Sequence, residues 1–272
     1  MPPTRADPDS KLGSESCDPW LEFSNIFRSE VQTLPQPWDE LFGPLRKGKV
    51  DDLVVVGQIG QSLDGRIATE TGHSNYINGP AGLAHLHRLR SLVDGVVVGV
   101  GTAIADDPQL TVRRVAGPQP ARVIIDPRGR LGAEARVFAS DGIRRLLITV
   151  GGTACKPPSG VEVVALPSTD GQLAPTAILT ALAGRGMRRL LIEGGADTVS
   201  RFLAAGCLDR LHVMVAPIII GSGRASVILP EIKRADEALR VPMRAHQIGD
   251  EVLFDCDLSA QRVCIDVAKI ST

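Results

Sequence analysis

Two glycines follow a glutamate in the run Leu190-Leu-Ile-Glu193-Gly194-Gly195-Ala196-Asp197-Thr198. Free backbone N–H groups at a helix start favour a phosphate, and glycine lets the backbone approach a ligand closely. Glu193 would lie at the carboxyl end of a strand, where α/β sheets place ligand groups. The run therefore indicates a phosphate site with an acid beside it, although a plain strand–turn–helix gives the same pattern.

A second glycine pair precedes two aspartates in the run Val98-Gly99-Val100-Gly101-Thr102-Ala-Ile-Ala-Asp106-Asp107-Pro108. It is not a full G-x-G-x-x-G motif, because isoleucine stands at position 104. Paired carboxylates beside a phosphate site suit proton transfer or the binding of sugar hydroxyls. Asp-Asp-Pro is also typical of a simple turn, which the motif favours when taken alone, and both interpretations stay open.

A third candidate is the polar, glycine-rich segment 60–77, which follows an apolar run. Loops that a rigid sheet positions often carry ligand-binding groups. Tyr76, the only tyrosine of the chain, lies in this segment. A ligand loop and an ordinary strand exit with a surface tyrosine are the two alternatives.

The histidines and cysteines do not form a pattern that could bind a metal. His85 and His87 are two residues apart in a helical segment and cannot share a face, and the other three histidines have no companion at ligand spacing. The five cysteines are scattered and include no C-x-x-C pair. We therefore expect no metal site, structural roles for the histidines and reduced cytoplasmic thiols. Hydrolase and nucleoside-triphosphatase functions lack support, because G-x-S-x-G and Walker A sequences are absent.

Alternating strand and helix patterns must position these candidates. Short apolar runs predict buried strands at 53–58, 95–100, 122–126, 146–150, 161–166, 189–193 and 211–216. Helical patterns occupy 80–92, 175–185 and 197–205, and two runs at 244–248 and 251–257 flank Gly249-Asp250. This order predicts an α/β fold, a layered and mostly parallel sheet closed by a C-terminal antiparallel hairpin.

The nine aromatic residues are distributed unevenly, since five of them lie in the first 49 residues. Trp20, Phe23, Phe27 and Val31 are spaced to share one helical face. We interpret 1–49 as an extension with an amphipathic helix, 50–259 as one domain and 260–272 as a tail. We expect the helix and the Trp38/Phe42 pair to dock on the protein's own surface or on a partner subunit.

Composition excludes several classes of function for the 272-residue chain. The formal net charge is −1, so bulk electrostatics do not favour nucleic acid. No apolar run approaches the roughly 18 residues that cross a bilayer, and the N-terminus lacks the apolar stretch of a secretory signal. We expect a cytoplasmic protein without a membrane or nucleic-acid partner.

Taken together and in this order, the motifs resemble the 5-amino-6-(5-phosphoribosylamino)uracil reductase family of riboflavin biosynthesis. The resemblance covers about residues 52–258. It rests on Ser62-Leu-Asp-Gly-Arg-Ile-Ala68, Gly72-His-Ser-Asn-Tyr-Ile77, Leu89-Arg90, the run from Val98 to Arg113, Arg122-Val-Ile-Ile-Asp126, Glu193-Gly-Gly and Ala216-Pro217-x-x-x-Gly221.

The resemblance implies a dihydrofolate-reductase-like fold, a homodimer and an NADPH-dependent enzyme that reduces the opened ribose of its phosphorylated pyrimidine substrate to a ribityl chain. By the same resemblance, the cofactor-binding residues are Gly60, Tyr76, Thr102, Asp106 and the run Gly194, Gly195, Ala196, Asp197 and Thr198, continuing to Arg201. The substrate-binding residues are Ser74, Arg90, Leu110, Arg113 and Glu193. Arg90 and Arg113 suit a substrate phosphate. Asp106, Asp107 and Glu193 are the candidate catalytic residues, with water as an alternative proton source.

Three departures from the family pattern bear on function. Tyr76 stands where tryptophan is frequent, which keeps a stacking surface. Pro127 follows Asp126 where a relative carries serine, so Arg128 and Arg130 are candidates for the NADP 2′-phosphate. The chain lacks the H-x-E and P-C-x-x-C signature of the zinc deaminase that accompanies bifunctional relatives, so we expect a stand-alone reductase. A same-fold reductase of another pyrimidine or a pterin, and a non-enzymatic NADPH-binding module, remain alternatives.

Overall fold

The computed structural model describes residues 19–29, 32–36, 38–74 and 77–265. The helices are α1 (Pro19–Phe27), α2 (Trp38–Phe42), α3 (Pro80–Leu92), α4 (Val100–Asp106), α5 (Pro175–Ala183) and α6 (Ala196–Ala204). The strands are β1 (Val54–Ser62), β2 (Arg66–Thr69), β3 (Gly95–Gly99), β4 (Ala121–Ile125), β5 (Arg145–Val150), β6 (Val161–Leu166), β7 (Arg189–Ile192), β8 (Arg210–Ala216), β9 (Gly223–Ala225), β10 (Met243–Ile248) and β11 (Glu251–Asp257). Val31 and Tyr76 lie outside the described residues.

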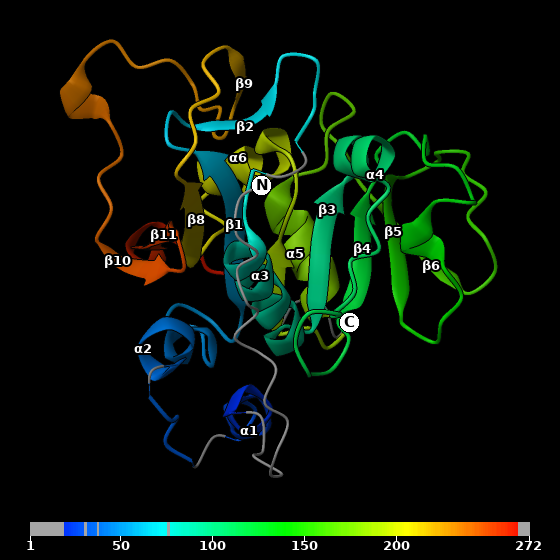
Figure 1. Ribbon diagram of the computed structural model, residues 1–272. Helices are drawn as coiled ribbons and strands as arrows, with labels where there is room; N and C mark the ends of the chain where they lie inside the picture. The colour runs from blue at the N-terminus through cyan, green and yellow to red at the C-terminus, as the bar shows by residue number, and fades with distance from the viewer. Residues whose placement is uncertain (1–18, 30–31, 37, 75–76, 266–272) are drawn as a thin grey trace, which may run out of the picture.

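Nine of these strands form one sheet in the order β10-β11-β8-β1-β7-β3-β4-β5-β6, and β2 pairs with β9 in a separate ribbon (Figure 1). All neighbours from β8 to β6 are parallel. The hairpin β10–β11 joins antiparallel to β8 and closes one edge. The predicted layered, mostly parallel sheet with a C-terminal antiparallel hairpin is therefore confirmed.

The central strands are buried on both faces, as their continuous apolar runs predict. In β1, Val55 belongs to the hydrophobic cluster that contains the apolar residues of α5 and α6, whereas Val54 and Val56 belong to the cluster beneath α3. Successive residues of a strand point to opposite faces, so one apolar run serves both layers. Figure 1 shows α3 on the near face and α5 and α6 behind the sheet.

Strand β1 is longer than its predicted range and extends past its neighbour β7. It pairs with β7 only from Val54 to Gly57, but with β8 as far as Ser62. Residues 58–62 therefore lack a β7 partner on one side. This opening lies at the carboxyl ends of the parallel strands, where open α/β sheets bind ligands.

The structure corrects several predicted boundaries. The predicted strand 95–100 ends at Gly99, and Val100 begins the short helix α4, which the sequence patterns did not indicate. Periodicity does not separate strand from helix here, because the run from Val96 to Ala105 is short and mostly apolar. The ribbon β2–β9 was also missed, since it joins two very short strands across more than 150 residues. Helix α5 ends two residues before its predicted end.

The described aromatic residues of the N-terminal segment pack against the chain's own main domain. Trp20, Phe23, Phe27 and Phe42 are almost completely buried. They share a hydrophobic cluster with residues of β1 and α3, and the Phe42 ring stacks on His85 with 5.6 Å between centroids. We call the described part of residues 19–45 the N-terminal arm. Its position below the sheet is visible in Figure 1.

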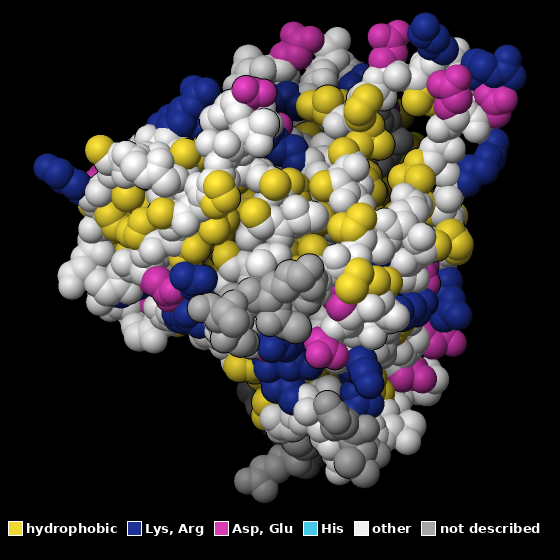
Figure 2. Space-filling model, turned by 180° about the vertical axis from the view of Figure 1, so that it is seen from behind, with side chains coloured by type: hydrophobic (Ala, Val, Ile, Leu, Met, Phe, Trp, Pro, Cys, Tyr) yellow, Lys and Arg dark blue, Asp and Glu magenta, His cyan; other side chains and the backbone are white. Residues whose placement is uncertain are grey.

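A long connection between β9 and β10 projects from the body of the molecule (Figure 1). It is exposed almost throughout, and Figure 2 shows charged side chains on the projection and hydrophobic ones beside it. Exposed hydrophobic residues in and next to it include Ile219, Ile232, Leu239 and Met243. Within the described ranges, no helix combines the length and apolarity needed to cross a membrane.

Candidate functional site

Two adjoining cavities lie at the carboxyl ends of the parallel strands. The larger, about 680 Å³, extends over the start of α6 and α4 and under β9. The smaller, about 590 Å³, lies between the free part of β1 and α3. Both sizes suit small-molecule ligands. The two cavities share wall residues, which are Ile67, Ser74, Thr102, Asp106 and Gly195.

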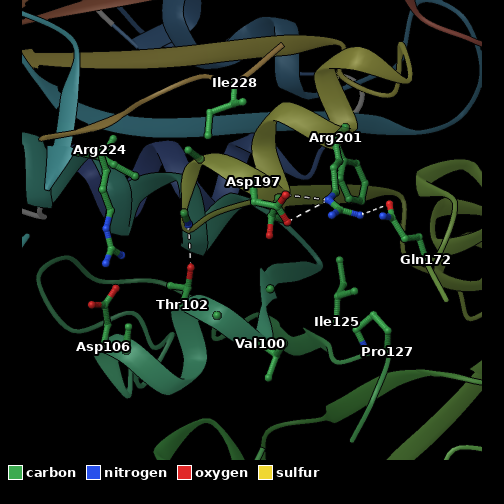
Figure 3. Close-up of a pocket in the computed structure, with 18 of the residues that line it drawn as sticks. Val100, Thr102, Asp106, Ile125, Pro127, Gln172, Asp197, Arg201, Arg224 and Ile228 are labelled. Carbon is green, nitrogen blue, oxygen red and sulfur yellow. Dashed lines mark hydrogen bonds and ion pairs between the residues drawn. The ribbon is translucent and has the colours of Figure 1, made fainter. Parts of the chain in front are cut away.

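The turn between β7 and α6 forms part of this shared wall, as the glutamate–glycine–glycine run predicts. Gly194 has φ +109°, and a Cβ there would lie 2.8 Å from Thr102 Oγ1. Gly195 N donates a hydrogen bond of 2.7 Å to Thr102 Oγ1, which joins the starts of α6 and α4 (Figure 3). Glycine is required at position 194 both for its left-handed backbone and for this close approach.

Asp106 lies where the two cavities meet, at the end of α4. Burial raises the pKa of its carboxyl group, while a hydrogen bond from the Ser74 hydroxyl and the charge of Arg224 oppose that rise. Figure 3 shows Arg224 pointing toward Asp106 across the cavity. Asp106 therefore holds a proton more readily than an exposed aspartate, which suits proton transfer.

Basic side chains surround the larger cavity. Arg128 and Arg130 line it and are exposed. Arg201 is bound by Asp197, with both bonds 2.9 Å, and donates to Gln172 Oε1 at 2.6 Å (Figure 3). Helix α6 starts at this wall, with its free N–H groups and positive dipole end. The larger cavity thus suits an elongated anionic ligand.

A buried ion pair forms one side of the smaller cavity. Arg90 Nε and Nη2 donate to the two carboxylate oxygens of Glu193 at 2.8 and 2.7 Å, and Arg90 Nη1 donates to Thr111 O at 3.0 Å. Although burial opposes its charge, the Glu193 carboxylate raises the pKa of Arg90. The expected phosphate role of Arg90 is weakened by this finding, because three of its N–H groups already have partners in the protein.

The segment from Asp107 to Gly117 borders the smaller cavity and carries two of the predicted substrate residues. Leu110 lines the cavity and is buried, with φ +54°. Arg113 lies outside both cavity walls and is exposed, and its backbone N donates to His87 Nδ1 at 3.0 Å. Burial and the nearby arginine charges lower the pKa of His87 to about 3, so this nitrogen can accept at neutral pH. His87 therefore has the structural role expected from the sequence.

An amide from the loop before α3 fills the space above Gly60. Glu251 is buried and accepts hydrogen bonds from Gly79 N, Gly82 N and Asn78 Nδ2 at 3.1, 2.7 and 2.7 Å. With Nδ2 fixed, Asn78 Oδ1 occupies the space that a Cβ of Gly60 would need. Any larger residue at position 60 would displace this amide from the wall of the smaller cavity.

The structure brings most of the predicted site residues together. The larger cavity is lined by Ser74, Thr102, Asp106, Gly195, Ala196, Asp197 and Thr198. The smaller adds Gly60, Arg90, Leu110, Glu193 and Gly194. Tyr76 lies outside the described residues. Asp107 lines neither cavity: it ends α4 with φ +39°, and its carboxylate accepts from Arg136 N at 2.8 Å. That position agrees with the alternative of a turn and does not support a catalytic role for Asp107.

Several lining residues were not singled out from the sequence. Gln58 and Asn78 line the smaller cavity, and Gln172 and Arg224 line the larger one. Asn78 directly follows the motif that ends at Ile77, so a motif longer by one residue would have included it. Arg224 offered no signal, because it reaches the cavity only through the pairing of β9 with β2. His85 and His212, which appeared isolated in the sequence, are 3.1 Å apart between Nε2 and Nδ1 in the core.

Comparisons with known proteins identify relatives of this chain. The chain is 33% identical over 215 residues to the protein of Methanothermobacter thermautotrophicus named 2,5-diamino-6-ribosylamino-4(3H)-pyrimidinone 5′-phosphate reductase, covering 74% of this chain and 96% of that relative. It is 35% identical over 174 residues to the riboflavin biosynthesis protein RibD of Bacillus amyloliquefaciens, covering 62% and 46%. It thus spans about half the length of that RibD relative.

The chain is also similar to solved structures of reductases. A Thermotoga maritima diaminohydroxyphosphoribosylaminopyrimidine deaminase/5-amino-6-(5-phosphoribosylamino)uracil reductase matches with a TM-score of 0.66 and 28% identity, over 75% of this chain and 56% of that chain. A Saccharomyces riboflavin biosynthesis reductase, 19% identical, supports the fold with a TM-score of 0.64, over 82% and 99%. The family profile described as the RibD C-terminal domain matches residues 54–253. The chain belongs to the RibD C-terminal domain family.

Proposed function

We propose that the chain is an NADPH-dependent reductase of riboflavin biosynthesis, which converts the ribose of 5-amino-6-(5-phosphoribosylamino)uracil to a ribityl chain. The observation that carries the proposal is the shared wall of the two cavities at Ser74, Thr102 and Asp106. A long anionic ligand in the larger cavity and a smaller one in the second cavity would meet there. The name of the Thermotoga relative includes this uracil reductase, and the archaeal relative is named as a reductase of the 2,5-diaminopyrimidinone phosphate. A cytoplasmic location stays a prediction.

The size of the larger cavity and the basic residues in its lining support NADPH as the cofactor. The first turn of α4 leaves open space over Gly101, where no atom lies within 4 Å of the position that a Cβ would take. The free N–H groups at the start of α6, which follow Gly195, would hold the pyrophosphate. The cofactor supplies a hydride when bound, and the protein's contribution is to place the reacting atoms and hold charge. Thr102 keeps the two helix starts together through its bond from Gly195 N.

The smaller cavity suits the substrate. Apolar residues, including Leu83, Leu86 and Leu110, would cover the faces of a flat ring, and amides of Gln58 and Asn78 offer hydrogen bonds to its edge. The Glu193 carboxylate, held by Arg90, can accept from sugar hydroxyls. Asp106 is the candidate source of the proton that accompanies the hydride. Arg113, exposed beside this cavity, is the candidate phosphate ligand.

The test is NADPH oxidation, followed by its absorbance. Three compounds are compared in parallel: the phosphoribosylamino-uracil, its 2,5-diaminopyrimidinone precursor and dihydrofolate. We expect turnover with the first. Turnover with the precursor alone would move the proposal to the substrate in the name of the archaeal relative. Turnover with dihydrofolate alone, or with none of the three, would contradict the proposed function.

We expect the double variant Arg128→Ala, Arg130→Ala to lose its preference for NADPH over NADH. Both side chains line the larger cavity and are exposed, so they can reach the 2′-phosphate that distinguishes the cofactors. Two charge-assisted contacts of about 1.5 kcal/mol or more each correspond to a preference change of at least about 100-fold. The ratio of kcat/KM for NADPH and NADH measures this effect. Arg234→Ala, an exposed arginine outside either cavity wall, is the control.

We also propose that the protein is a homodimer. Exposed hydrophobic residues lie in and beside the projecting connection. Leu239 within it, Ile219 before β9 and Met243 at the start of β10 are 48%, 74% and 53% exposed. Strand β10, at the edge of the sheet, is unpaired on its outer side within the described residues. Hydrophobic residues beside an open sheet edge are typical of an association surface. Sedimentation velocity should give twice the mass of the chain, and a monomer would contradict the proposal.

A further inference from the structure

The N-terminal arm packs against the outer side of helix α3, and the inner side of this helix lines the smaller cavity. The Arg88 guanidinium of α3 lies over the Trp20 and Trp38 rings, 5.5 and 4.5 Å from their centroids. Two residues further along the same helix, Arg90 binds Glu193 in the cavity wall. One helix therefore connects the arm to the site.

The arm also contacts the segment that borders the substrate cavity. Trp20 Nε1 donates a hydrogen bond of 3.0 Å to the backbone oxygen of Ala116, which is 96 residues away in sequence. Trp20, Leu110 and Val115 belong to one hydrophobic cluster. The hydrogen bond joins α1 to the far end of the segment from Asp107 to Gly117.

That segment holds a backbone that the chain would not adopt without support. Asp107 and Leu110 have φ +39° and +54°, values that are costly for residues with a side chain. Contacts from outside the segment hold it in place. Gln119 binds both N and O of Val112, at 2.7 and 2.8 Å. Arg90 and His87 add bonds to Thr111 O and Arg113 N.

The hydrogen bond from the arm to this segment is made at Ala116. The described hydrogen bonds from Gln119, His87 and Arg90 hold residues 111–113. The hydrogen bond from Trp20 holds the backbone at residue 116, where the chain leads on to β4. Without the Trp20 bond, residues 114–117 would lose their support from the arm. The exposed side chain of Arg113, which lies outside the cavity walls, stands at the start of this less supported stretch.

We propose that Trp20 is a positioning residue, through which the N-terminal arm sets the segment 110–117 for binding of the phosphorylated pyrimidine. The inference rests on the proposed function for the identity of that substrate. Trp20 does not touch substrate or cofactor in this scheme. It acts on the backbone that carries Leu110 and Arg113, so it serves the substrate side and not the larger cavity.

Trp20→Phe tests the inference, because it keeps an aromatic ring in the cluster and removes the Nε1 donor. The matched control is Trp38→Phe: Trp38 shares the stacking on Arg88 but makes no hydrogen bond to the segment 110–117 among the described residues. Hydrogen exchange of the free protein is measured first, since it needs no substrate. We expect faster exchange of the amides in 110–117 in Trp20→Phe only. Equal exchange in the two variants would overturn the proposal.

Steady-state kinetics supply the second measurement. Loss of one hydrogen bond that positions the segment should raise the KM for the phosphorylated pyrimidine about fivefold in Trp20→Phe. We expect the KM for NADPH and kcat to stay within twofold, and Trp38→Phe to match the wild type in all three values. A rise in both KM values, or the same change in both variants, would indicate a structural role and overturn the proposal. Faster exchange in 110–117 without turnover of any phosphorylated pyrimidine would keep the positioning role and reject the proposed function.

Discussion

Glu193→Gln is expected to lower kcat/KM at least about 100-fold and to destabilise the protein by about 3–5 kcal/mol. Both side chains of the Arg90–Glu193 pair are only 7% exposed, so the amide would leave a buried guanidinium without its counter-charge. The substituted residue also loses the carboxylate that we assign to the sugar hydroxyls. Urea denaturation and steady-state kinetics measure the two effects separately.

The chain offers a matched control for this variant. Arg210 and Asp255 form a comparable buried pair, with bonds of 2.7 and 2.5 Å, and line neither cavity. Asp255→Asn should therefore cost similar stability, with KM and kcat close to wild type below its transition temperature. The double variant Arg90→Met, Glu193→Leu should regain much of the stability but not the activity, because apolar pairs can replace buried ion pairs. Wild-type kcat/KM in Glu193→Gln would refute the role of this carboxylate.

Phe42→Ala should destabilise the protein by about 3–5 kcal/mol, which is the usual cost of removing a buried phenylalanine. Its ring is fully buried, lies 5.3 and 5.8 Å from those of Trp20 and Phe23, and stacks on His85. For a chain of this size the transition temperature should fall by roughly 10 °C. Thermal unfolding followed by circular dichroism measures the shift.

Leu21→Ala is the control for the second prediction. Leu21 lies in helix α1 of the same N-terminal arm, but its side chain is partly exposed at 37%, so little should change. Equal transition temperatures for the two variants would mean that the arm does not belong to the folded core. Below the transition, Phe42→Ala should retain the kcat of the wild type, because the ring lines neither cavity.

The sequence predicts an element of the fold correctly where the pattern that identifies it lies within one continuous segment. The apolar runs of β1 and β7 and the helical pattern of α3 are continuous, so their types and approximate positions follow from periodicity. The short helix α4 does not, because Val100 to Ala105 continues the apolar run of β3 with only Thr102 as a polar residue. The ribbon β2–β9 depends on a pairing between distant segments, and no local pattern indicates it.

The sequence predicted which residues form the site better than it predicted which of them contact one another. The glycine run at 194–195 and Asp106 lie on the shared wall, as motif spacing suggested. The pairing of Arg90 with Glu193 joins residues 103 positions apart, and it changes what Arg90 can offer to a phosphate. Likewise, only the tertiary structure shows that Asp107 turns toward Arg136 while its neighbour Asp106 faces the cavity.

The place of β1 in the sheet has a consequence for how the protein is made. This strand ends at Ser62, whereas its neighbours β7 and β8 begin much further along the chain, at Arg189 and Arg210. Glu251, which binds the start of α3, comes later still. A nascent chain emerging from the ribosome therefore carries its central strand without partners until β7 and β8 have been translated. We expect the domain to fold late and slowly, as pairings of high sequence separation do, with chaperone dependence during synthesis.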